Sequence, residues 1–300
     1  MALVAFDLDN TLGFFYHIGI WADFFSVETV ENTFNQKINP SFWISDSVER
    51  SMRRAQKVFI EKLLRQPDLL NLILRPNLDA MILPLIKAKK QGIVRAICIY
   101  SNSWNPFVLQ VAKELIETIY KCKGFFDCLV DASHPIRAYD WTLEKHGEPS
   151  KNLITLKKIF RNLCNVKGPI DPEDILFLDD REPKHDLAKL ESKGLVYLKP
   201  TKFDPALTDR DRKKIFMLGI DVLDDCDLLE DSEYLDSDVF HCKKYNTSTD
   251  LKKISNIYDL LEMAEKKLKS EGVDGKLFNN DTKYILKTIK YFLSRTRYLR

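Results

Sequence analysis

The residues best suited to chemistry follow the first apolar run of the chain. Residues 3–6 are too few for a helix and predict a buried strand. Asp7 and Asp9 come directly after this run, and alternation along an extended chain places both carboxylates on one side. Carboxylate oxygens are hard ligands that suit Mg²⁺, and a bound metal leaves one carboxylate ionised as a nucleophile while the other carries a proton. Thr11 can hydrogen-bond and hold the turn that follows.

This Asp-x-Asp motif also has plainer interpretations. A calcium-binding EF-hand loop begins in the same way, but it needs glycine at the sixth position and glutamate at the twelfth. The chain has Leu12 and Ile18 at those positions, which excludes an EF-hand. An acidic turn after a strand, and a related fold without activity, stay open on this motif alone.

The overall composition predicts a globular protein. The chain has 300 residues, of which 45% are apolar and 11% aromatic, so it can bury a substantial core. This length allows one large domain or one domain with sizeable additions. The formal net charge of +2 gives no overall case for binding to nucleic acid or to a membrane.

The cysteines indicate a reducing compartment. None of the six belongs to a CxxC pair, and several lie in apolar runs, so buried reduced thiols are favoured over a metal site or disulfides. The N-terminus lacks a basic segment before its short apolar run, and no apolar stretch approaches membrane-spanning length. We therefore expect a soluble cytoplasmic or nuclear protein without a membrane partner.

Strand and helix patterns alternate over the first two thirds of the chain. Further apolar runs bounded by turn residues predict strands at residues 93–100, 125–130 and 175–178. Helical patterns are expected at residues 78–91, 106–120 and 151–163, and residues 133–150 read as an irregular loop. This alternation predicts an α/β fold with a parallel sheet and right-handed crossovers.

Polar residues follow three of these predicted strands. Ligands of parallel sheets bind at the carboxyl ends of the strands, so these residues are expected to share one site. The residues are Asp7, Asp9, Ser101, Asp179 and Asp180.

Two segments lie outside this pattern. Residues 14–74 begin with aromatic residues and continue with two helical patterns, which predicts a mainly helical insertion over the site. In residues 205–300 we expect a solvated acidic loop over Asp221–Asp238, a helix over Leu251–Lys269 and a last helix capped by Asp281 or Thr282. Six basic residues and no acidic one lie between Lys283 and Arg300, which suggests either a solvated basic face or binding to nucleic acid or an acidic partner.

The strand followed by Asp-x-Asp-x-Thr closely resembles the signature of the haloacid dehalogenase-like (HAD) phosphohydrolases. The resemblance covers residues 1–200. It implies that Asp7 is the nucleophile that forms an aspartyl-phosphate and that Asp9 is the general acid and base. It also implies that Thr11 steadies the loop, and that the Ser101 hydroxyl and the Asn102 backbone N–H hold a phosphate oxygen.

The family also requires a lysine and a final acidic pair. Lys151 is our choice because it lies at a helix start, with Lys145 and Lys157 as alternatives. The resemblance implies that Asp180 binds Mg²⁺ together with Asp7 and the backbone carbonyl of Asp9. It implies that Asp179 positions the lysine or a metal-bound water, and which of the two aspartates touches the metal stays open.

Within this superfamily, three short sequence segments are similar to segments of the RNA polymerase C-terminal-domain phosphatases and their small relatives. These segments are Arg75–Asp79, Lys151–Leu156 and Leu178–Pro183. The chain departs from that group in having Asn10 in place of a common acidic residue, and in its longer stretch between the first motif and Arg75. Residues beyond about 205 have no counterpart in that group.

The resemblance implies a HAD fold, that is, a Rossmann-like parallel sheet. Its catalytic core would comprise residues 1–13 and 75–204, with a cap at 14–74 and a helical C-terminal extension at 205–300. The predicted function is Mg²⁺-dependent hydrolysis of a phosphomonoester, either a phosphoprotein or a small phosphometabolite or nucleotide. Two alternatives remain: a catalytically weak scaffold that binds a partner through its C-terminal helices, and a polynucleotide end-phosphatase.

Overall fold

The computed structural model describes residues 2–25, 46–143, 148–182, 194–205, 207–226, 228 and 277–298. The chain divides into two compact units, each built from separate stretches of sequence. The first unit comprises Met1–Phe15, Asn71–Pro205 and Val273–Arg300, and the second comprises Tyr16–Leu70 and Ala206–Gly272. The residues expected to form one C-terminal extension are therefore divided between the two units.

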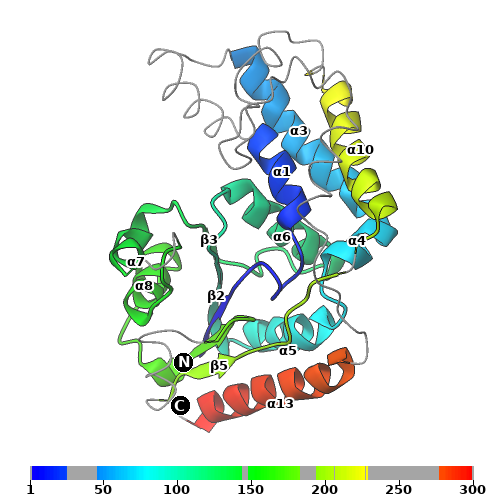
Figure 1. Ribbon diagram of the computed structural model, residues 1–300. Coiled ribbons are helices and arrows are strands. Elements are labelled where there is room, and N and C mark those ends of the chain that lie inside the picture. Colours follow the sequence, from blue (N-terminus) through cyan, green and yellow to red (C-terminus); the bar gives the residue numbers. More distant parts are fainter. Residues whose placement is uncertain are drawn as a thin grey trace. The chain divides into compact units, whose positions relative to one another are not determined.

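The first unit contains a five-stranded, all-parallel sheet in the order β3-β2-β1-β4-β5 (Figure 1). Its strands are β1 (Ala2–Phe6), β2 (Val94–Tyr100), β3 (Cys128–Val130), β4 (Ile175–Leu178) and β5 (Val196–Leu198). The sheet confirms the predicted Rossmann-like α/β class. Strand β1 is buried along its whole length and lies between β2 and β4, which explains its continuous apolar run.

Helices separate these strands along the chain, as the crossovers of a parallel sheet require. They are α5 (Leu78–Lys90), α6 (Pro106–Ile119), α7 (Ala138–Thr142) and α8 (Leu153–Lys158), and α13 (Leu277–Tyr298) follows the last strand. Short helical turns are η1 (Pro135–Arg137), η2 (Ile159–Leu163, π-helical) and η3 (Pro172–Asp174). The loop expected at residues 133–150 thus includes η1 and α7. Figure 1 shows α13 running alongside α5, in agreement with their contacts.

Helix α8 and the π-helical turn pack on one face of the sheet. Leu156, Ile159 and Phe160 from these helical segments join alternate side chains of β1, β2 and β4 in one buried cluster. On that face the ring of Phe177 meets Tyr197 edge-on, with centroids 5.5 Å apart. The intervening strand residues point to the opposite face of the sheet, where the ring of Phe6 packs edge-on against that of Phe126.

The second unit is helical in its described part. It contains α1 (Tyr16–Phe24), α3 (Asp46–Leu64) and α10 (Asp209–Asp225), while α4 (Pro67–Ile73) leads back to the first unit. Helix α10 packs against both α3 and α1. Gly219 of α10 permits close packing, because a Cβ there would lie 2.0 Å from the ring of Trp21. Lys62 pairs with Asp225 at 2.7 Å across the α3–α10 contact.

Other expectations for the C-terminal third have mixed outcomes. Residues 221–225 belong to α10 rather than to a loop, and the rest of the predicted acidic loop falls almost wholly outside the described residues. The helix expected over Leu251–Lys269 also lies outside them. The last helix begins at Leu277, so neither Asp281 nor Thr282 is its cap. No described helix has both the length and the apolar character needed to cross a membrane.

Candidate active site

Three buried carboxylates meet at the carboxyl ends of two adjacent strands. Asp7 follows β1, and Asp179 and Asp180 follow β4. A carboxylate oxygen of each lies within 4.8 Å of one from each of the others. They converge because Phe6 and Leu178, the last residues of β1 and β4, are in register, and the Asp7 N–H donates to the Leu178 carbonyl at 2.7 Å. The sheet therefore brings together residues about 170 positions apart in the sequence.

Lys151 joins this cluster from the start of α8. Its Nζ donates hydrogen bonds to Oδ1 of Asp7 and, at 2.9 Å, to Oδ2 of Asp179. The helix begins at this point because the Asn152 side chain accepts a hydrogen bond from the Thr155 N–H, which caps its first turn. Of the two alternative lysines, Lys157 lies in the last turn of α8, and Lys145 lies outside the described residues.

Burial and crowding perturb the acids of this cluster. Burial raises the pKa of Asp7 to about 7, against the opposing effect of Lys151. The pKa of Asp180 is raised by burial and by the charge of Asp179. Burial lowers the pKa of Lys151, but Asp179 and Asp7 outweigh that effect and hold it above its ordinary value. The lysine is therefore firmly charged among carboxylates that repel one another.

Asp9 is not one of these three carboxylates, but the charges of Lys151 and Asp180 act on it. Its Oδ1 accepts a hydrogen bond of 3.3 Å from the backbone N–H of Phe15, and burial raises its pKa to about 6. Its carboxylate does not belong to the group of three that could hold a metal among the described residues. A carboxyl group with this pKa can exchange a proton near neutral pH, as a general acid and base must.

Thr11 connects the first acidic loop to the last one. Its hydroxyl accepts a hydrogen bond from the Asp180 N–H at 2.9 Å and lies 3.4 Å from Oδ1 of the same residue. Asn10, which lies between Asp9 and Thr11 in the sequence, has a φ of 62°. Asparagine tolerates this left-handed conformation better than most residues, which gives a backbone reason for the departure at position 10.

Ser101 and Asn102 follow β2 at the same edge of the sheet. Ser101 is buried, and its hydroxyl accepts a hydrogen bond of 3.0 Å from the Ser103 N–H, which leaves the hydroxyl hydrogen available as a donor. Strand β2 runs parallel to β1 with Ile99 opposite Phe6, so Ser101 lies one residue further beyond the strand ends than Asp7 does. Ser101 and Asn102 therefore lie at the same carboxyl end of the sheet as the acidic cluster.

A buried polar network supports this loop and the start of α8, which Lys151 precedes. Arg137 donates hydrogen bonds to the Ser101 carbonyl, to Oδ1 of Asn102 at 2.8 Å and to Asp140 at 2.6 Å. Asp140 also accepts from the Tyr100 hydroxyl at 2.5 Å and from the Asn152 side chain at 2.7 Å.

Sequence reasoning missed Arg137 and Asp140, because they lie in a stretch that reads as an irregular loop. Both side chains are fully buried, whereas arginine and aspartate are seldom fully buried unless they are paired. Their pattern, a basic residue three positions before an acidic one, is too common to single them out.

The cluster of three aspartates fits a divalent cation. If all three are ionised they carry three negative charges, and Lys151 offsets one of them. Two charges remain, which a Mg²⁺ ion would balance, and the donors are the hard oxygens that Mg²⁺ prefers. Asp179 already accepts hydrogen bonds on both oxygens, from Lys151 at 2.9 Å and from the Arg181 N–H at 2.9 Å.

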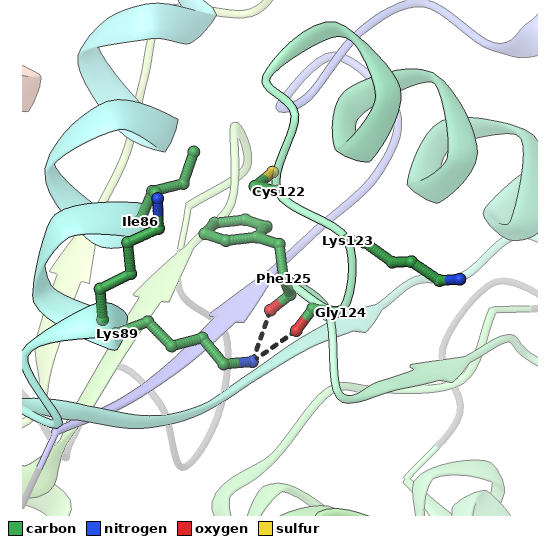
Figure 2. A pocket seen from close by; sticks show the side chains of 7 residues that line it. Ile86, Lys89, Cys122, Lys123, Gly124 and Phe125 are labelled. Atoms are coloured by element: carbon green, nitrogen blue, oxygen red, sulfur yellow. Dashed lines mark hydrogen bonds between the residues drawn. The ribbon is translucent and has the colours of Figure 1, made fainter.

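A separate pocket lies between the end of α5 and the loop that precedes β3. Figure 2 shows Ile86, Cys122 and Phe125 lining it, with the Lys89 amine directed at backbone carbonyls. That amine donates hydrogen bonds to the carbonyls of Gly124 and Phe125 at 2.9 and 2.8 Å, and so stabilises the loop before β3. The pocket includes none of the residues of the acidic cluster.

No protein-family model and no curated protein matches the chain. Among solved structures, the chain has a distant structural neighbour, the crystal structure of a Thermotoga maritima protein assigned as a β-phosphoglucomutase. The match has a TM-score of 0.32 and 14% sequence identity, and it covers 72% of this chain and 91% of that one. These comparisons give no support to the narrower grouping with the RNA polymerase C-terminal-domain phosphatases. The chain is a parallel α/β protein with a buried acidic cluster at the carboxyl edge of its sheet.

Proposed function

We propose that this protein is a Mg²⁺-dependent phosphomonoester hydrolase that works through an aspartyl-phosphate on Asp7. The observation that supports this most strongly is the position of Lys151, whose amine contacts both Asp7 and Asp179 within a cluster of buried carboxylates. A nucleophilic carboxylate must approach a phosphate that is itself negatively charged. A fixed cation beside the nucleophile lowers that repulsion.

The proposed reaction has two steps. In the first, a carboxylate oxygen of Asp7 attacks phosphorus, and the bond between phosphorus and the leaving oxygen breaks while Asp9 donates a proton to that oxygen. In the second, Asp9 accepts a proton from a water molecule, which attacks the phosphorus of the aspartyl-phosphate. Inorganic phosphate leaves, and Asp7 is restored as a carboxylate.

The remaining polar residues bind the phosphoryl group in this scheme. Lys151 offsets the charge of Asp7 and of the phosphate. The hydroxyl of Ser101 and the backbone N–H of Asn102 donate to a phosphate oxygen as charge develops on it. Arg137 holds the loop that presents both donors, through the Ser101 carbonyl and the Asn102 side chain.

Asp7 and Asp180 are the proposed side-chain ligands of Mg²⁺, together with the backbone carbonyl of Asp9. Asp179 is assigned to positioning, because both of its oxygens already accept hydrogen bonds. When bound, the ion would supply positive charge next to the phosphoryl oxygens.

The substrate class follows from the same proposal. The similarity of three sequence segments to the RNA polymerase C-terminal-domain phosphatases makes a phosphorylated protein segment one class, and a small phosphometabolite or nucleotide is the other. The basic residues between Lys283 and Arg300 suggested a polynucleotide substrate, but at least one of them contacts the protein itself. Arg295 of α13 donates to the carbonyls of Glu173 and Gly194 at 2.6 and 2.7 Å.

Hydrolysis of an aryl phosphate tests the proposal. The rate is measured with Mg²⁺, with EDTA, and for Asp7→Asn, with Glu61→Gln as an exposed control on α3. We expect turnover that EDTA abolishes and that Asp7→Asn lowers by several orders of magnitude, since the amide is nearly isosteric but not nucleophilic. A phosphopeptide, a sugar phosphate and a nucleotide complete the panel. Lack of turnover on the whole panel would favour the scaffold alternative.

A further inference from the structure

Two thiols lie close together on the α8 face of the sheet. The sulfurs of Cys128 and Cys164 are 3.1 Å apart, and no disulfide joins them. Cys128 begins β3, and Cys164 follows the π-helical turn η2. A disulfide has a sulfur–sulfur distance of about 2.05 Å, so an approach of about 1 Å would form the bond.

The two cysteines differ in accessibility from their neighbour Cys98. Cys98 pairs with Cys128 in the register of β2 and β3, and it is fully buried. Cys128 and Cys164 are only partly buried, so a small reagent can reach them. The pKa of Cys164 is raised by its hydrogen bond with Cys128 and by burial. The hydrogen bond with Cys164 lowers the pKa of Cys128, but the interaction with Cys98 and burial outweigh it and raise that pKa too. Both thiols are therefore mainly protonated at neutral pH, which slows exchange.

We propose that Cys128 and Cys164 are a redox-active dithiol that low-molecular-weight disulfides, such as glutathione disulfide, convert to an intramolecular disulfide. The thiolate of one cysteine attacks the reagent, displaces one thiolate and forms a mixed disulfide. The second cysteine attacks that mixed disulfide and displaces the other. Two protein thiols are oxidised, one reagent disulfide is reduced to two thiols, and the two protons pass to the released thiolates.

The disulfide would change the unfolded chain more than the folded one. It closes a loop across a sequence separation of 36 residues, which restricts the unfolded ensemble and raises the midpoint of thermal unfolding. This inference does not depend on the proposed hydrolase activity, because its readouts are covalent structure and stability.

The experiment uses the full-length chain, incubated with glutathione disulfide, then alkylated under denaturing conditions and digested with trypsin. Each of the two thiols lies in its own tryptic peptide, Gly124–Arg137 for Cys128 and Asn162–Lys167 for Cys164, whereas Cys98 lies in Ala96–Lys113. We expect the two former peptides to be cross-linked and the number of alkylated thiols to fall from six to four. Dithiothreitol should reverse both changes.

Matched variants complete the test. Cys128→Ser and Cys164→Ser should each abolish the cross-link and the rise in the unfolding midpoint. Cys122→Ser, which alters a thiol in the separate pocket of Figure 2, should leave both unchanged. A cross-link between Cys98 and Cys128, or six alkylated thiols after the incubation, would overturn the proposal.

Discussion

The guanidinium of Arg75 donates a hydrogen bond of 2.8 Å to the carboxylate of Asp281, and both side chains are almost completely buried. Arg75 precedes α5, and Asp281 lies in the first turns of α13. The same guanidinium donates to the carbonyls of Asn10 and Thr11 in the first acidic loop. The C-terminal helix therefore supports the loop that follows Asp7, although some 270 residues separate them in the sequence.

Replacement of Asp281 should destabilise the first unit. Asp281→Ala leaves the buried charge of Arg75 without its carboxylate, and loss of one partner of a buried pair costs about 3–5 kcal/mol of unfolding free energy. Asp281→Asn keeps an acceptor and should cost less. Hydrogen exchange of the β1 amides measures the change within this unit.

An exposed ion pair serves as the control for that prediction. Lys199 pairs with Glu182 at the surface, and Lys199→Ala should change stability by no more than about 1 kcal/mol. Equal protection of the β1 amides in Asp281→Ala and in the wild type would show that the buried pair does not support this strand.

Replacing a single oxygen atom of Asp140 should also lower the stability of the protein. Asp140→Asn replaces one acceptor oxygen with a donor among the hydroxyl of Tyr100, the guanidinium of Arg137 and the amide of Asn152. We expect a loss of about 2–4 kcal/mol in denaturant unfolding. Tyr100→Phe removes one donor and should cost about 1 kcal/mol. A smaller effect for Asp140→Asn than for Tyr100→Phe would contradict the assignment of Asp140 as the centre of the network.

Loss of Lys151 should weaken catalysis more than stability, on the proposed function. Lys151→Met removes the cation beside Asp7 but keeps a side chain of similar length, and kcat/KM should fall on the order of a hundredfold or more. Lys157→Met changes a lysine of α8, the helix that Lys151 precedes, and should leave kcat/KM within about twofold. Equal losses in the two variants would exclude a special role for Lys151.

Mg²⁺ should stabilise the protein through the acidic cluster. A ligand at 100 times its dissociation constant adds about 2.7 kcal/mol to the unfolding free energy, so the midpoint of thermal unfolding should rise when Mg²⁺ is added to EDTA-treated protein. Asp180→Asn should reduce this rise, and Glu61→Gln should not. A rise of the same size in Asp180→Asn would place the ion elsewhere.

The three strands in the middle of the sheet were predicted from their mainly apolar sequences. β1, β2 and β4 are buried in the middle of the sheet, so their sequences carry a clear signal. The edge strand β3 was predicted at residues 125–130 and occupies Cys128–Val130. The other edge strand, β5 (Val196–Leu198), is equally short and was not predicted. Helix α10 was also missed, since its sequence is rich in charged residues and its packing on α3 and α1 is a tertiary effect.

In the candidate site, too, some residues could be predicted from the sequence and others could not. Asp7, Asp179 and Asp180 could be placed together because each directly follows a predictable strand of a parallel sheet. The roles of Arg137, Asp140 and Asp281 depend on contacts between distant parts of the chain, which no local pattern carries. Asp281 illustrates this most clearly, since it reads as a helix cap but forms a buried ion pair.

The most direct test of the central claim is to locate the covalent intermediate. Protein quenched during turnover of a phosphomonoester is treated with borohydride, which reduces an aspartyl-phosphate to homoserine, and the tryptic peptide Met1–Lys37 is sequenced by mass spectrometry. We predict homoserine at position 7 and an unmodified Asp9. Turnover with homoserine at position 9, or without modification at either residue, would contradict the proposed mechanism.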